Sequence, residues 1–350
     1  FGPFEKKASE IRIGIIGTKV GIDNFKKFLE ELKNPSQFAN TLDVGRPYFA
    51  GIENIFQINI ASTIEEVIIP EEEISDRLYV NNVFERTHNT VDLFINYLDE
   101  YRASEESINT DIWFIVVPDE VKKNCSPLSK PYPTKGVSYK KSALPSKAKA
   151  VKLIKSDPLL SNTDYNDIKV YDFYPNFHHQ LKARLLSKHL TTQIVRENLV
   201  SDLIKEIEFK PKLTPDLTLR QIQTKKNFAE RKKNEAISYK HHILWQLASA
   251  IFYKLGNRPW KLSNIRPGVC YIGLVYKKYE SLVDYGNAVC AAQMFLDDGD
   301  GMVFKSNGKP LFNKRTKEYH LKSDDAYDLI AQAIKSYQNN NILAVKEFTY

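Results

Sequence analysis

The sequence has few of the residues and runs that define several common protein classes. Its three cysteines, Cys125, Cys270 and Cys290, are odd in number and widely spaced, which predicts neither a disulfide framework nor a zinc site. This cysteine usage indicates a reducing, cytoplasmic compartment. No run reaches the roughly 18 apolar residues that a membrane-spanning helix needs, and no signal peptide opens the chain. We therefore expect a cytoplasmic protein without a membrane partner.

A dinucleotide fingerprint is also missing. Gly14, Gly17 and Gly21 lie at the first apolar run and its end, but they do not form G-x-G-x-x-G, so the sequence does not favour NAD binding.

Acidic residues are absent between Glu120 and Asp157, where lysines are frequent, and a second basic stretch spans residues 220–233. The formal net charge of the chain is only +7, so the distribution of charge matters more than its total. Each stretch is typical either of a surface along a phosphate backbone or of a solvated, lysine-rich segment. The residues leave both interpretations open.

Apolar runs that alternate with helical patterns predict a layered α/β fold, Rossmann-like, with a parallel sheet. The expected strands are residues 11–17, 56–62, 112–118 and 168–175. Ligands of such sheets bind outside the carboxyl ends of the strands. Proline, serine and lysine dominate residues 119–167, which we expect to be an irregular excursion.

The later part of the chain has a different pattern. A helix is expected at residues 234–255, ended by Gly256 and Pro259. A strand at 269–278 and a hairpin at 287–306 follow, and a helix begins at Ser323. The DDGDG turn of the hairpin departs from the calcium-loop pattern and predicts a polar turn. We place a first domain at residues 1–265 and a second at 266–350.

Four residues carry the chemistry that the sequence suggests: His178, Lys182, Gln193 and Lys254. His178 and Lys182 are four residues apart, so on a helix after Pro175 they share one face. An imidazole, two ammonium groups and a carboxamide offer donors to a doubly charged phosphate, and a helix N-terminus adds a positive dipole end. A surface helix with incidental basic residues is the plainer interpretation of the first pair.

These motifs resemble those of the MID domain of Argonaute proteins. The resemblance rests on H-x-x-x-K at residues 178–182, TQ at 192–193 and YKLGNRPW at 253–260. It implies that the four residues bind the 5′ phosphate of a guide strand. It also implies that residues 266–350 begin a ribonuclease-H-like PIWI domain, which we expect to be incomplete. The chain opens on Phe1, and we expect native residues to be missing before it.

The resemblance further implies that the chain has no slicer activity. In cleaving Argonautes, the strand that matches residues 269–278 carries a metal-binding Asp two residues after its glycine, and here Gly273 is followed by Leu274 and Val275. The opening FGPFEKKASEIRIGIIGT, CYIGLVYKK at 270–278 and AAQMFLDDGDGMVF at 291–304 resemble short prokaryotic Argonautes. Such a protein would bind a guide RNA, with Mg²⁺ or another divalent cation at its first phosphates, and pair it with a single-stranded DNA target. Recognition would activate a separate APAZ-containing effector in prokaryotic immunity, with a TIR, sirtuin-like or nuclease domain, TIR being favoured.

Further residues are candidates for contacts with nucleic acid, and Tyr174 or Phe177 is a candidate to stack on the first base. The candidates for backbone contacts are His179, Thr192, Arg196, Arg220, Lys225, Lys226, Arg231 and Lys232.

Two other classes remain open on the sequence alone. The basic cluster also suits a Rossmann-type enzyme that binds a mononucleotide or a phosphorylated metabolite, although no nucleophile and base pair is apparent. The third class is a structural α/β interaction protein in which the cluster is accidental.

Overall fold

The computed structural model describes residues 10–35, 47–105, 107–129, 138–156, 169–205, 209–211, 214, 217–259, 266, 268–278, 288–297, 300–313 and 315–341. The chain divides into two compact units, Phe1–Pro259 (unit 1) and Trp260–Tyr350 (unit 2). The boundary expected after residue 265 falls a few residues beyond this division.

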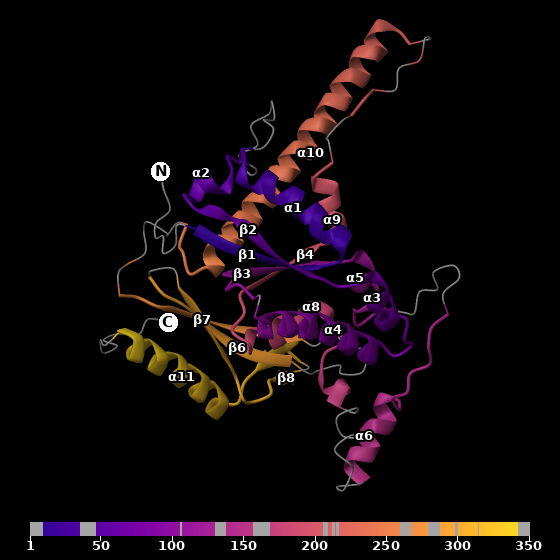
Figure 1. The fold of residues 1–350 in the computed structure, drawn as a ribbon. Helices are drawn as coiled ribbons and strands as arrows, with labels where there is room; N and C mark the ends of the chain where they lie inside the picture. Colours follow the sequence, from indigo (N-terminus) through magenta and orange to yellow (C-terminus); the bar gives the residue numbers. More distant parts are fainter. Residues whose placement is uncertain are drawn as a thin grey trace. The chain divides into compact units, whose positions relative to one another are not determined.

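A four-stranded parallel sheet forms the centre of unit 1 (Figure 1). Its order is β2-β1-β3-β4, with β1 at Glu10–Gly17, β2 at Asn59–Ile68, β3 at Ile112–Val117 and β4 at Thr192–Arg196. All six residues of β3 are buried, as expected for a central strand that is covered on both faces. The predicted α/β class with a parallel sheet is confirmed.

Helices cover both faces of this sheet. One face packs against α1 (Lys19–Lys33), α2 (Ile52–Phe56), α9 (Glu197–Leu203) and α10 (Leu219–Lys254). The other packs against α3 (Glu71–Leu78), α4 (Val83–Ala103), α5 (Asp119–Asn124) and α8 (Phe177–Leu186). Because side chains of a strand alternate, Phe114 faces the first layer and Trp113 the second.

The expected strand at 168–175 is wrong for its described residues. Val170–Asp172 form a short 3₁₀ helix, and the fourth strand comes from Thr192–Arg196. Tyr171 packs on Ala150 and Phe84, so the apolar run serves a small side cluster and not the sheet. Periodicity alone cannot separate a short apolar strand from a packed turn. The stretch expected to be irregular, 119–167, contains α5 and α6 (Lys147–Ser156).

Helix α10 is longer than the helix expected at 234–255. It begins at Leu219, where Thr218 and Gln221 form a capping box. It ends as predicted at Gly256, which has φ 76°. There the N–H of Gly256 donates to Tyr253 O (3.0 Å) and that of Asn257 to Phe252 O (3.2 Å), the Schellman pattern. Lys254 is therefore the last residue of the helix.

Unit 2 contains an antiparallel sheet with a helix on one face. Its strands are β5 (Tyr271–Lys278), β6 (Ala288–Phe295) and β7 (Gly301–Lys305), in that order. Leu329 of α11 (Ser323–Asn341) packs on Cys290 and Ala292 of β6. Two short strands, β8 (Leu311–Asn313) and β9 (Glu318–His320), pair with each other. The expected strand, hairpin and helix start at Ser323 are confirmed, and Asp298 of the turn lies outside the described residues.

Among the helices described, none combines the length and apolar character that crossing a membrane requires.

Candidate functional site

Helix α8 begins where the sequence predicts and presents the expected pair of basic residues. Asn176 caps it by accepting from the His179 N–H (3.1 Å). Phe177, Leu181 and Leu185 fill the core beneath it. Because these apolar residues fix the buried side of the helix, His178 and Lys182 lie together on the neighbouring side.

Lys182 and Lys254 converge on one backbone carbonyl at the start of β4. The Lys182 ammonium donates to Thr192 O and to Thr192 Oγ1 (3.0 Å). Lys254 Nζ donates to the same Thr192 O (2.8 Å). The preceding carbonyl, of Thr191, accepts from Trp113 N (2.9 Å) in β3, so the Thr192 carbonyl points to the opposite, free edge of β4.

Gln193 completes the cluster from the same strand. Its Oε1 accepts from Lys254, and its Nε2 donates to Ile194 O (3.2 Å). A lysine in a last helical turn is most often a partner for the free carbonyls of its own helix. Lys254 instead reaches β4, which brings residues 182, 192, 193 and 254 to one point.

Partial burial and neighbouring positive charge act on the pKa values of the cations in the cluster. Burial, and then the charge of Lys254, lower the pKa of Lys182 to about 8. Burial also lowers the pKa of Lys254. Partial desolvation, followed by the charges of Lys182, His179 and Lys254, lowers the pKa of His178. Within the described part of the chain, neither ammonium has a carboxylate partner.

Such a cluster is suited to an anion with more than one charge. Two ammonium groups, an imidazole and a carboxamide supply donors, and a bound dianion would offset the burial and the neighbouring positive charge that lower these pKa values. The cluster does not fit a metal ion, because ammonium groups cannot ligate one. Over the described residues, no group of three or more His, Cys, Asp or Glu side chains could hold a metal.

The aromatic candidates separate into one core residue and one partly exposed residue. Phe177 is 4% exposed and packs edge-on against Phe94 (5.3 Å between ring centroids), so it does not face a ligand. Tyr174 is half-buried and stacks on the exposed His179 at 6.0 Å. This stacked pair lies beside His178 and is the remaining candidate surface for a base.

The other candidates for nucleic-acid contact lie outside the cluster or serve it differently. Thr192 is 5% exposed, and its oxygens bind the two ammonium groups, so it positions the lysines. Arg196 is exposed at the far end of β4. The remaining candidates lie in the first half of α10, at least 22 residues before Lys254, and are Arg220, Lys225, Lys226, Arg231 and Lys232.

The cluster lies at the amino end of β4, whereas we expected it at the carboxyl edge of the sheet. That expectation depended on the strand at 168–175, which does not form. A pocket of about 360 Å³ does lie at the carboxyl ends of β1, β3 and β4. Its lining includes Glu71, Asp119, Glu120 and Glu197, and burial followed by Glu71 and Asp119 raises the pKa of Glu197. This acidic lining disfavours a phosphate there.

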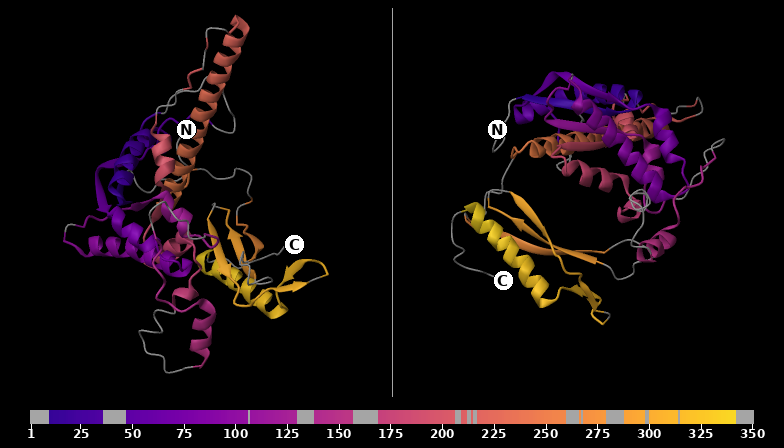
Figure 2. Two further views of the ribbon diagram at one scale, coloured as in Figure 1. Left: turned by 90° about the vertical axis from the view of Figure 1, so that its right-hand side faces the viewer. Right: turned by 60° about the horizontal axis from the view of Figure 1, so that its bottom comes forward.

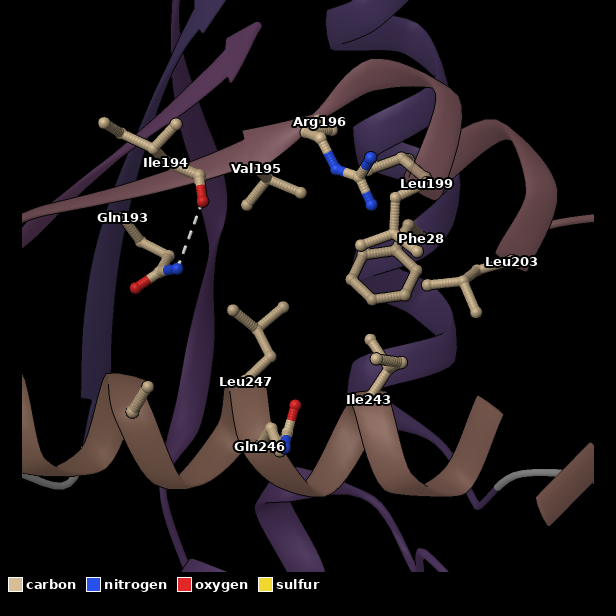
Figure 3. A pocket seen from close by; sticks show the side chains of 12 residues that line it. Phe28, Gln193, Ile194, Val195, Arg196, Leu199, Leu203, Ile243, Gln246 and Leu247 are labelled. Carbon is tan, nitrogen blue, oxygen red and sulfur yellow. Dashed lines mark hydrogen bonds between the residues drawn. The ribbon is translucent and has the colours of Figure 1, made fainter. Parts of the chain in front are cut away.

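An apolar pocket adjoins the cluster through Gln193 (Figure 3). It has a volume of about 330 Å³ and lies between β4, α9 and α10, where Leu199, Leu247 and Ile243 point into it.

Comparisons with known proteins give structural neighbours only. No family model matches the chain, and no curated protein sequence matches it significantly. Solved structures that it resembles include Clostridium butyricum Argonaute bound to a guide DNA and a 19-mer target DNA, with 13% identity and a TM-score of 0.43. Others are Aa-Ago with externally bound siRNA, with 13% identity and a TM-score of 0.35, and Aquifex aeolicus Argonaute, with 12% and 0.35. The matches cover 97% of this chain but 31%, 30% and 31% of those chains.

Proposed function

We propose that unit 1 binds the 5′-phosphorylated end of a guide strand, most suitably RNA, and presents it for pairing with single-stranded DNA. In this proposal, Lys182 and Lys254 neutralise the terminal phosphate, while His178 and Gln193 donate to its oxygens. Unit 1 then has the role of a MID domain and unit 2 that of the first part of a PIWI domain. The target sequence is read by base pairing, and the protein holds the end and the backbone.

One observation carries this proposal. Lys182 and Lys254, which are 10 and 62 residues from Thr192 in the sequence, both donate to its carbonyl oxygen, and neither has a carboxylate partner among the described residues. Folding brings them together at a cost in electrostatic free energy, since like charges repel and partial burial disfavours the charged form. A terminal phosphomonoester carries nearly two negative charges near neutral pH, whereas an internal diester carries one. The cluster therefore suits the end of a strand better than its interior.

We do not assign strand cleavage to this chain. Val275 occupies the position at which the resemblance expects the first metal-binding carboxylate, and it is 43% exposed on β5 opposite Ala291. An isopropyl group cannot ligate magnesium. We propose that Mg²⁺, where it is bound, is held by the phosphates of the guide strand.

The output of target recognition is assigned to a partner. We propose an APAZ-containing effector, preferably of the NAD-depleting TIR type, that is switched on in prokaryotic immunity when the guide pairs with DNA. This step depends on the sequence resemblance. Co-purification of the neighbouring open reading frame's product with this chain, followed by NAD consumption on addition of guide and target, is its test.

The binding step is tested with one RNA oligonucleotide carrying either a 5′ phosphate or a 5′ hydroxyl. Loss of two charge-assisted hydrogen bonds, each about 1.5–3 kcal/mol, predicts at least about 100-fold weaker binding of the hydroxyl form. Equal affinity for the two forms would sink the proposal. Failure to bind either, together with tight binding of a mononucleotide, would favour the Rossmann-type enzyme.

A further inference from the structure

The first half of α10 projects from unit 1 without a core beneath it. We call residues 219–236 the α10 arm; at 1.5 Å per residue it is about 27 Å long. Figures 1 and 2 show it extending past the sheet and the other helices of unit 1. Within the arm only Ala229 is buried, and Leu219 and Phe228 are 87% and 54% exposed. From Ile237 onward, buried residues recur along one side of α10.

Positive charge lies on every side of the arm. It has six Arg and Lys residues and two Glu residues, a net charge of +4 over 18 residues. At 100° per residue, the basic residues form three rows around the helix: Arg220 with Arg231, Lys225 with Lys232, and Lys226 with Lys233. An amphipathic surface helix would instead have one apolar side.

The local ion pairs offset little of this charge. Arg231 and Lys232 share a single acid, Glu235, at 3.6 and 2.8 Å. Within the described residues, Arg220, Lys226 and Lys233 have no ion pair. Arg231 and Lys232 also lie over the exposed ring of Phe228, at 5.4 and 5.9 Å from its centroid. Like charges without a core destabilise a helix, so the arm is a costly feature for an isolated protein.

A polyanion would remove this cost, whereas an apolar partner would find no apolar side to cover. We infer that the α10 arm binds the phosphate backbone of the guide–target duplex, at a distance from the guide's 5′ end. This inference rests on the proposed function, because Lys254 of the 5′-phosphate cluster is the last residue of the same helix. The helix thus serves as a ruler with a terminal-phosphate group at one end and backbone contacts at the other.

The helix sets the length at which contact begins. Of Arg220, Lys226 and Lys233, the nearest to Lys254 is Lys233, 21 residues or about 32 Å away along the axis. We take the duplex to run along α10 from the cluster: about 8 base pairs then span about 27 Å at 3.4 Å per pair and end before Lys233, whereas about 20 base pairs span about 68 Å. Arm contacts therefore act only on the longer duplex.

The test uses the full chain with Arg220→Gln, Lys226→Gln and Lys233→Gln, which removes three charges and keeps good helix formers. The matched control removes three other exposed or half-exposed charges of unit 1, with Lys19→Gln, Lys27→Gln and Lys205→Gln. Both are compared with wild type on 5′-phosphorylated RNA paired to DNA over the short and the long length. Circular dichroism checks that the helix content of the arm variant is unchanged.

For the long duplex, the arm variant should lower the slope of log affinity against log salt by up to about 2.7, which is about a 40-fold change in relative affinity between 50 and 200 mM salt. The short duplex and the control variant should show no such change. An equal loss on both lengths, or no loss on the long one, overturns the inference. The preference for a 5′ phosphate should persist in the arm variant; its absence in wild type would instead count against the proposed function.

Discussion

The basic residues on the two sides of the α8 segment differ in whether they pair with an acidic side chain. On one side, Arg184 pairs with Asp92, and Lys188, just past the helix, pairs with Asp99 at 2.8 Å. On the other side, Lys182 faces Lys254 and shares a carbonyl with it. The first side uses charge to attach α8 to α4. The second concentrates charge that folding alone does not require, which is the property expected of a binding site.

The largest expected effect comes from removing both unpaired cations. In the Lys182→Ala, Lys254→Ala double variant, affinity for 5′-phosphorylated RNA should fall by about 3–6 kcal/mol, because two charge-assisted hydrogen bonds to the phosphate are lost together. Titration of labelled RNA measures this. The control is Lys188→Ala, which removes a neighbouring charge that already has a partner and should leave the dissociation constant within about twofold. Wild-type guide affinity in the double variant would disprove the site.

The second effect concerns pH. In the free protein Lys182 has a pKa of about 8, and a bound phosphate would raise it, so binding takes up a proton above that pH. Affinity should fall as pH rises beyond 8, by up to about tenfold per unit, and should also fall below about pH 6, where the phosphate loses its second charge. Lys182→Arg keeps its charge at high pH and should weaken the alkaline decline. A flat alkaline profile for wild type would contradict this assignment.

Much of unit 1 follows from patterns in the sequence, and the reasons differ between segments. Apolar runs such as Ile112–Val117, which is short and bounded by Asp111 and Pro118, favour a central strand that is covered on both faces. The Asn176 cap and the stop at Gly256 are local features that a few residues determine.

The features that the sequence did not predict share one physical cause: they depend on contacts between residues distant in sequence. In the run expected to be a strand at 168–175, Tyr171 packs against Phe84 and Ala150, which are distant in sequence. The same holds for the point of convergence in the cluster. His178, Lys182, Gln193 and Lys254 were identifiable from their types and motif, but the acceptor that collects the two ammonium groups is a backbone carbonyl, and every residue has one. Only the position of Thr192 at a free sheet edge distinguishes it.

A smaller effect on affinity is expected for Gln193, the uncharged residue of the cluster. Gln193→Ala should weaken binding of 5′-phosphorylated RNA by about 1 kcal/mol, since the carboxamide contributes hydrogen bonds without charge. The same variant should leave the salt dependence of binding unchanged, whereas loss of either lysine should reduce it. Equal losses for Gln193→Ala and Lys182→Ala would show that charge does not dominate the site.

The last effect is on the stability of the free protein, and its sign differs between the two sides of α8. A lysine whose pKa is lower in the folded than in the unfolded state destabilises the fold while it is charged. For Lys182 this penalty is full below about pH 8 and disappears as pH rises towards the unfolded value of 10.5. After a discount for solvent screening and for the lost hydrogen bonds to Thr192, Lys182→Met should stabilise the free protein at pH 7 by about 1 kcal/mol. Arg184→Met should destabilise it by about 1 kcal/mol, because Asp92 loses its arginine partner and keeps only the contact with His88. Denaturant unfolding of the two variants without nucleic acid measures both signs, and a destabilised Lys182→Met would mean that the lysine serves the fold and not a ligand.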